Sequence, residues 1–117
     1  MPRILLVEDD ADTRLVMQHT LIDGGHEVDT TETVLGGREL IRDRAYDLLV
    51  ADGRMPDGTG MEVADQAREK GMPVLIVTGY AFELPKDDLK RFEFLLKPVH
   101  PNELLEAVER ALQTEST

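Results

Sequence analysis

The sequence contains no cysteine, and it has no long apolar run. Without cysteine the chain has no disulfide, no thiolate metal site and no cysteine nucleophile. This composition suits a cytoplasmic protein, because disulfides are rare in that compartment. The apolar run that follows Met1-Pro2-Arg3 is only four residues long, so we expect neither a signal-peptide core nor a membrane span.

Positive charge is also scarce. The 13 lysines and arginines are outnumbered by 24 aspartates and glutamates, and the formal net charge is −11. Such a surface repels phosphate backbones and anionic lipids, which argues against nucleic-acid binding and against a membrane partner. It attracts divalent cations and basic patches on partner proteins.

The 117 residues fit one compact domain, so we expect a single domain over residues 1–117. Several short apolar runs are nearly continuous, which is typical of strands buried on both faces of a parallel sheet. A weaker strand fits residues 27–30, after the turn pair Gly24-Gly25. The continuous runs are Ile4–Val7, Leu48–Ala51, Val74–Val77 and Phe94–Leu96.

Helical patterns lie between these strands. Helices are predicted over residues 11–23, 34–45, 60–70 and 101–112, with Asp10 as the cap of the first. Residues 80–92 give no clear helix, because Pro85 interrupts the pattern. Strand and helix thus alternate five times, which predicts an α/β fold with a doubly wound, five-stranded parallel sheet and helices on both faces. The first helix is expected to bury Leu15, Met17, Leu21 and Ile22, and the last to bury Leu104, Leu105, Val108, Ala111 and Leu112.

Polar residues follow four of the predicted strands, namely Glu8-Asp9-Asp10, Asp52, Thr78-Gly79 and Lys97-Pro98. The carboxyl ends of parallel strands meet at one edge of a sheet, where ligands bind. Carboxylates gathered there repel one another, and a divalent cation that prefers oxygen, most commonly Mg²⁺, removes that repulsion. A lysine and a hydroxyl at the same edge could hold a phosphoryl group. Together these groups favour phosphoryl transfer to a carboxylate.

Each of these residues alone has a simpler structural explanation. An aspartate after a strand commonly caps a turn or a helix, and this is how we interpret Asp10. Alone, Thr78 would satisfy a backbone group and Lys97 would be a solvated surface residue. Their joint placement at separate strand ends favours the functional interpretation.

The segments ILLVEDDADTR, DLLVADGRMPDGTGMEV, PVLIVTG and FLLKPVHPNELL resemble the receiver domain of bacterial two-component response regulators. The resemblance covers nearly the whole chain in the right order. It implies a flavodoxin-like fold of the receiver type and a stand-alone receiver domain in phosphorelay signalling. It also implies Mg²⁺ as cofactor and a histidine kinase or histidine phosphotransfer protein as phosphoryl donor.

The resemblance assigns the metal and phosphoryl roles. Asp52 matches the phosphorylated aspartate, and Lys97 matches the lysine that pairs with phosphoryl oxygens. Glu8 and Asp9 match the acidic pair that binds Mg²⁺, Asp9 directly and Glu8 through water, together with Asp52 and the backbone carbonyl of Arg54.

Further positions match the switch and the surroundings of the site. Thr78 and Phe94 match the switch pair. The bond between Lys97 and Pro98 is expected to be cis. Four more matches are Met55-Pro56 and Gly60 in the loop after the acceptor, and Gly79 where the backbone approaches the phosphoryl group. Arg54 and Tyr80 match the two positions that flank the approach of the hydrolytic water in the family, and their large side chains predict a long-lived phosphorylated form.

Other possibilities stay open. The stretch from Thr78 to Lys97 is shorter than is typical of the family, so the shape of the fourth helix and of the output face is undetermined. The chain could be a receiver domain cut from a larger hybrid kinase or regulator, or a non-phosphorylated binding module. An aspartyl-phosphate phosphatase is disfavoured, because Arg54 stands where such enzymes need a general acid. The cognate kinase, the downstream target and the oligomeric state are not determined by the sequence.

Overall fold

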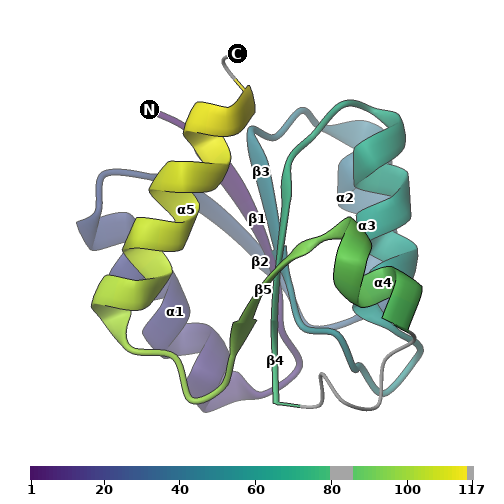
Figure 1. Ribbon diagram of the computed structural model, residues 1–117, viewed down its shortest axis with the longest axis horizontal. Coiled ribbons are helices and arrows are strands. Elements are labelled where there is room, and N and C mark those ends of the chain that lie inside the picture. Colours follow the sequence, from purple (N-terminus) through teal and green to yellow (C-terminus); the bar gives the residue numbers. More distant parts are fainter. Residues whose placement is uncertain (80–85, 116–117) are drawn as a thin grey trace.

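The computed structural model describes residues 1–79 and 86–115, in which strands and helices alternate along the chain (Figure 1). The strands are β1 (Arg3–Val7), β2 (Glu27–Thr31), β3 (Leu48–Ala51), β4 (Val74–Thr78) and β5 (Glu93–Leu96). The helices are α1 (Ala11–Asp23), α2 (Val34–Asp43), α3 (Gly60–Glu69), α4 (Lys86–Arg91) and α5 (Pro101–Glu115).

All five strands are parallel and form one sheet in the order β2-β1-β3-β4-β5. Helices α1 and α5 cover one face of this sheet, while α2, α3 and α4 cover the other (Figure 1). The predicted doubly wound architecture is therefore confirmed. The strand order reverses after β2, which makes the carboxyl ends of β1 and β3 the place where a ligand site is expected.

The continuous apolar runs follow from this layering. Successive side chains of a strand point to opposite faces, and here both faces are covered by helices. In β1, Leu5 and Val7 contribute to the core under α2 and α3, whereas Ile4 and Leu6 contribute to the core under α1 and α5. All four side chains are fully buried.

The predicted boundaries agree with the structure to within a few residues. Helix α2 ends at Asp43, two residues earlier than predicted, because Arg44 is already extended while its N–H still donates to the carbonyl of Leu40. Helix α4, which the sequence left open, spans Lys86–Arg91 in the described part of the chain. Pro85 and Tyr80 themselves lie outside the described residues.

The predicted core face of α1 is only half correct. Met17 and Leu21 are buried, but Leu15 and Ile22 are 54% and 48% exposed. Residues two apart on a helix lie about 200° apart around its axis, so Leu15 points away from the side on which Met17 meets the sheet. None of the helices described, α1 to α5, is long and apolar enough to cross a membrane.

Candidate functional site

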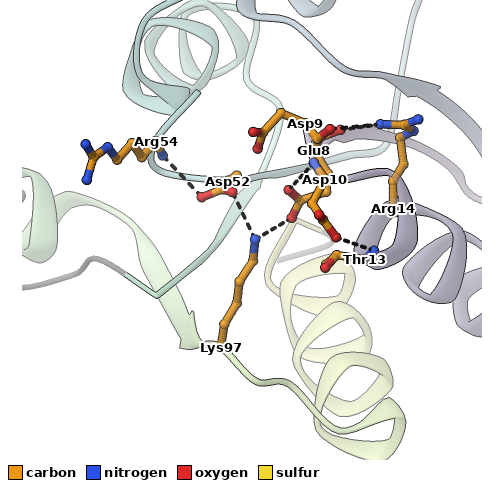
Figure 2. A network of polar contacts seen from close by, with 8 residues as sticks. All are labelled: Glu8, Asp9, Asp10, Thr13, Arg14, Asp52, Arg54 and Lys97. Atoms are coloured by element: carbon orange, nitrogen blue, oxygen red, sulfur yellow. Dashed lines mark hydrogen bonds and ion pairs between the residues drawn. The ribbon is translucent and has the colours of Figure 1, made fainter. Parts of the chain in front are cut away.

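Four strand ends come together at one edge of the sheet and carry the polar residues of the site. The register pairs Val7 with Ala51 on β1 and β3, and Thr78 with Leu96 on β4 and β5. The residues that follow these strands therefore lie beside one another. Figure 2 shows Glu8, Asp52 and Lys97 pointing toward one another from three separate strands.

Lys97 connects two buried carboxylates. Its Nζ lies 2.6 Å from Oε1 of Glu8 and 2.9 Å from Oδ2 of Asp52 (Figure 2). Glu8 is only 1% exposed and Asp52 only 5%. Two buried carboxylates this close repel each other, and a shared ammonium group offsets that repulsion.

Burial changes the protonation of this cluster. It raises the pKa of Glu8 to about 7, and the nearby charge of Asp52 adds to this, against hydrogen bonds from Lys97 and from the backbone N–H of Asp10. Burial lowers the pKa of Lys97, but the hydrogen bonds and charges of Glu8 and Asp52 outweigh that effect, and the net pKa is raised. Lys97 therefore stays cationic, and a metal ion bound by Glu8 would displace the proton of this carboxyl group to solvent.

Glu8, Asp9 and Asp52 also form a group of possible metal ligands. Each offers a carboxylate oxygen, and these oxygens lie within 4.8 Å of one another. Asp9 is exposed, so the group opens to solvent on its side. The donors are all oxygen atoms, with no histidine or cysteine in the group. Such a donor set fits a hard divalent cation such as Mg²⁺ rather than a transition metal.

Arg14 of α1 hydrogen-bonds the backbone of the acidic pair Glu8 and Asp9, a role that the sequence did not predict. Its Nη1 donates to the backbone carbonyls of Glu8 at 2.9 Å and Asp9 at 3.4 Å (Figure 2). Its Nη2 lies 3.6 Å from the carboxylate of Glu32. A basic residue one turn into the helix after an acidic pair is a weak sequence signal, because many helices carry such a residue on a solvated face.

Asp10 has the capping role that was predicted for it. Its Oδ2 accepts a hydrogen bond from the N–H of Thr13 at 2.8 Å, and this starts α1. The N–H of Asp10 also donates to Oε2 of Glu8 at 3.1 Å. The start of the helix therefore helps to orient the buried carboxylate.

The loop after β3 shapes the surroundings of Asp52. The N–H of Arg54 donates to Oδ1 of Asp52 at 3.2 Å. Gly60 begins α3 so close to the backbone of Asp52 that any Cβ there would clash with the carbonyl oxygen of Asp52. Only glycine fits this position, which explains its place in the motif. The Arg54 side chain is exposed, and in Figure 2 its guanidinium points away from Asp52.

Of the remaining predicted residues, Thr78 and Pro98 lie at the same edge, and Phe94 lies further back on β5. Thr78 is fully buried at the end of β4, and its carbonyl accepts from the N–H of Lys97 at 3.1 Å. Phe94 is partly buried on β5, opposite Ile76, two positions along β4 from Thr78. The bond between Lys97 and Pro98 is cis, as predicted.

The last two predicted site residues are Gly79 and Tyr80, which follow Thr78 in the chain. Gly79 is exposed, and a Cβ added there would make an ordinary contact of 3.8 Å with Lys97. Tyr80, the second predicted flanking residue, lies outside the described residues.

An apolar groove of about 470 Å³ borders the site. It lies between α1 and the segment after β5, and Lys97 and Pro98 form part of its wall. Val16 of α1 also lines the groove and is 58% exposed. The site is thus flanked by an accessible apolar surface. The other residues that line the groove are Asp12, Thr13, Met17, Val77 and Val99.

Comparison with known proteins agrees with this geometry. Residues 4–109 match the family model described as the response regulator receiver domain. The response regulator protein PilR of Pseudomonas aeruginosa is 35% identical over 118 residues, covering 95% of this chain and 26% of PilR. The response regulator receiver protein CpdR of Brucella abortus is 32% identical over 117 residues, covering 96% of this chain and 98% of CpdR. The chain thus spans about a quarter of the first relative and nearly all of the second.

Solved structures give the same fold. A CheY-like receiver domain protein from Methanospirillum hungatei has a TM-score of 0.91 at 30% identity, covering 99% of this chain and 97% of that one. The response regulator protein TrrA of Thermotoga maritima, crystallised in complex with Mg²⁺-BeF, has a TM-score of 0.84 at 30% identity, covering 95% and 99%. The flavodoxin-like fold expected from the sequence is confirmed.

Proposed function

Because this chain belongs to the response regulator receiver domain family, we propose that Asp52 accepts a phosphoryl group during two-component signalling. The observation that carries the proposal is the position of Lys97, whose ammonium group contacts both Glu8 and Asp52. We propose that residues 1–117 act as one receiver domain. A receiver domain cut from a larger regulator stays an alternative, since PilR is about four times as long as the segment matched.

The proposed reaction moves a phosphoryl group from a phosphohistidine of a partner to Asp52. An oxygen of Asp52 attacks the phosphorus, the bond between phosphorus and the histidine nitrogen breaks, and the imidazole leaves with the bonding electron pair and takes up a proton. Lys97 exchanges its contact with Asp52 for a contact with a phosphoryl oxygen. When bound by Glu8, Asp9, Asp52 and the carbonyl of Arg54, Mg²⁺ would supply further positive charge against the developing negative charge.

Thr78 and Phe94 are proposed to transmit the change. The Thr78 hydroxyl donates a hydrogen bond to the new phosphoryl group, and Phe94 enters the space that Thr78 leaves. The surface formed by α4, β5 and α5 then changes shape, and a downstream protein binds it.

The phosphoryl donor is proposed to be a histidine kinase or a histidine phosphotransfer protein. Such a donor must bring its histidine to Asp52, and the apolar groove beside Lys97, with exposed Val16, offers a docking surface there. We propose a cytoplasmic protein that binds neither nucleic acid nor membrane, in line with its net charge of −11. Apart from its own phosphorylation and dephosphorylation, it is not an enzyme.

Acetyl phosphate tests the proposal without a known kinase. The wild-type protein should gain one phosphoryl group in Mg²⁺ and none in excess EDTA, as measured by intact-protein mass spectrometry. Peptide mapping should place the group on Asp52, and Asp52→Asn should remain unmodified. Equal labelling of Asp52→Asn would show that the acceptor lies elsewhere. No labelling of the wild type by acetyl phosphate or by phosphorylated kinases would favour a binding module that is not phosphorylated.

A further inference from the structure

Asp57 lies in the loop between β3 and α3 but makes its hydrogen bonds with a different helix. Its Oδ1 accepts from the N–H of Val34 at 2.9 Å, and its Oδ2 accepts from the N–H of Leu35 at 3.1 Å. Val34 and Leu35 are the first two residues of α2. Amide groups at the start of a helix have no acceptor within the helix, and a carboxylate is their best partner. Asp57 is therefore a cap of α2 supplied from 23 residues away.

Helix α2 also has a local cap. The Oγ1 of Thr33 accepts from the N–H of Gly36 at 2.9 Å. The local cap is sufficient to begin the helix in the usual way. The bonds to Asp57 add a link that the helix alone does not require, and this link joins α2 to the loop that follows Asp52.

Backbone hydrogen bonds close the loop on either side of Asp57, so the contact of Asp57 with α2 also restrains residues 55–58. The N–H of Met55 donates to the carbonyl of Gly58 at 2.9 Å, and the N–H of Gly58 donates back at 3.3 Å. Met55 is only 6% exposed and belongs to the same core cluster as Val34. Residues 55–58 therefore form a small closed turn whose Asp57 carboxylate bonds the start of α2 and whose Met55 side chain lies in the same core cluster as Val34.

Arg54 immediately precedes this turn and contacts the acceptor. Its N–H donates to Oδ1 of Asp52, while Oδ2 of Asp52 faces Lys97. The orientation of the Asp52 carboxylate thus depends on where the Arg54 peptide group is held. The bonds from Val34 and Leu35 also lower the pKa of Asp57, so this carboxylate stays charged at neutral pH.

We propose that Asp57 is a positioning residue for the metal and phosphoryl site. By capping α2 it holds the turn at residues 55–58, and through that turn it holds the Arg54 peptide group against Asp52. The inference rests on the proposed function, since it assigns Asp57 a role in the same site. Asp57 touches neither the metal nor the phosphoryl group, so its effect is indirect.

Asp57→Ala and Thr33→Ala form a matched pair that tests the proposal. Both substitutions remove a cap from the same helix, but only the first releases the loop that holds Asp52. Affinity for Mg²⁺ is measured by calorimetry at a temperature where all variants are folded. Asp57→Ala should weaken Mg²⁺ binding by about tenfold, the lower end of the effect of residues that orient metal ligands. Thr33→Ala should leave Mg²⁺ affinity within about twofold of the wild type, because no contact of Thr33 reaches the site.

A second measurement does not depend on metal. Hydrogen exchange of the Arg54 and Met55 amides should accelerate in Asp57→Ala and stay unchanged in Thr33→Ala. Asp57→Asn keeps one acceptor oxygen and should give intermediate values in both measurements. Equal Mg²⁺ affinity in Asp57→Ala and Thr33→Ala, with a wild type that binds Mg²⁺, would overturn the positioning role. A wild type that binds no Mg²⁺ would instead count against the proposed function.

Discussion

At the scale of single residues, the site depends on a balance of buried charges. Glu8 and Asp52 are almost completely buried, and Lys97 is the cation shown in contact with both. Such an arrangement contributes little net stability, because desolvation of the charges offsets their attraction. In the proposed function, its value lies in having an ammonium group and a carboxylate suited to a metal ion already in place when a phosphoryl group arrives.

The low pKa of Asp57 predicts a specific dependence of stability on pH. A carboxylate whose pKa falls below its ordinary 3.8 on folding contributes stability above that value and loses it as the pH falls through the folded pKa. The difference in unfolding free energy between wild type and Asp57→Asn should therefore be constant from about pH 5 to 8 and shrink as the pH falls below 3.8. Urea unfolding at several pH values measures it. The effect of Thr33→Ala should not change over this range, because a hydroxyl does not titrate there. A difference for Asp57→Asn that is independent of pH would contradict the charged cap.

Two glycines at the site should respond very differently to a methyl group. Gly60→Ala places a Cβ against the backbone oxygen of Asp52, which cannot rotate away, and should cost about 3 kcal/mol of unfolding free energy. Gly79→Ala makes only an ordinary contact with the Lys97 side chain and should change stability by less than about 1 kcal/mol. Chemical denaturation of both variants measures the difference. Similar costs for the two substitutions would show that α3 shifts easily away from β3.

At the scale of the element, α1 shows how a helix divides its apolar residues. Leu21 is fully buried against the sheet, whereas Leu15 is 54% exposed. Leu21→Ala should therefore cost about 2–5 kcal/mol, the usual range for a buried leucine, and Leu15→Ala less than about 1 kcal/mol. Both substitutions lie in the same helix and change its intrinsic propensity equally. A cost for Leu15→Ala as large as that for Leu21→Ala would contradict the orientation of α1.

At the scale of the whole molecule, the net charge of −11 acts against compactness, and bound cations relieve it. If Mg²⁺ binds the folded site specifically, as proposed, it should raise the unfolding free energy more than NaCl does at equal ionic strength. At 100 times its dissociation constant the gain should be about 2.7 kcal/mol.

Asp9→Ala is the control for this prediction. It removes one of the three carboxylates grouped at the site and should lose most of the gain specific to Mg²⁺ while keeping the general effect of salt. Thermal unfolding monitored by circular dichroism measures both contributions. Identical stabilisation of wild type and Asp9→Ala would place the bound ion elsewhere.

The sequence by itself determined the architecture and the composition of the site. Apolar runs such as Ile4–Val7 and Leu48–Ala51 predict buried parallel strands, because both their faces must be covered. Since parallel strands end at one edge, residues that follow them were predicted to meet. The structure brings Glu8, Asp52 and Lys97 within hydrogen-bonding distance, as that reasoning requires.

Only the tertiary structure decided the supporting contacts. Asp57 is separated from Val34 by 23 residues, and no local pattern distinguishes it from an ordinary turn aspartate. In the same way, the sequence does not distinguish Arg14 from an ordinary solvated residue of a helix. The buried face of α1 was predicted wrongly for Leu15, because an apolar side chain is not buried by its type alone, and the direction in which the helix meets the sheet decides its burial. Long-range packing sets all three, and it depends on how complete elements fit together.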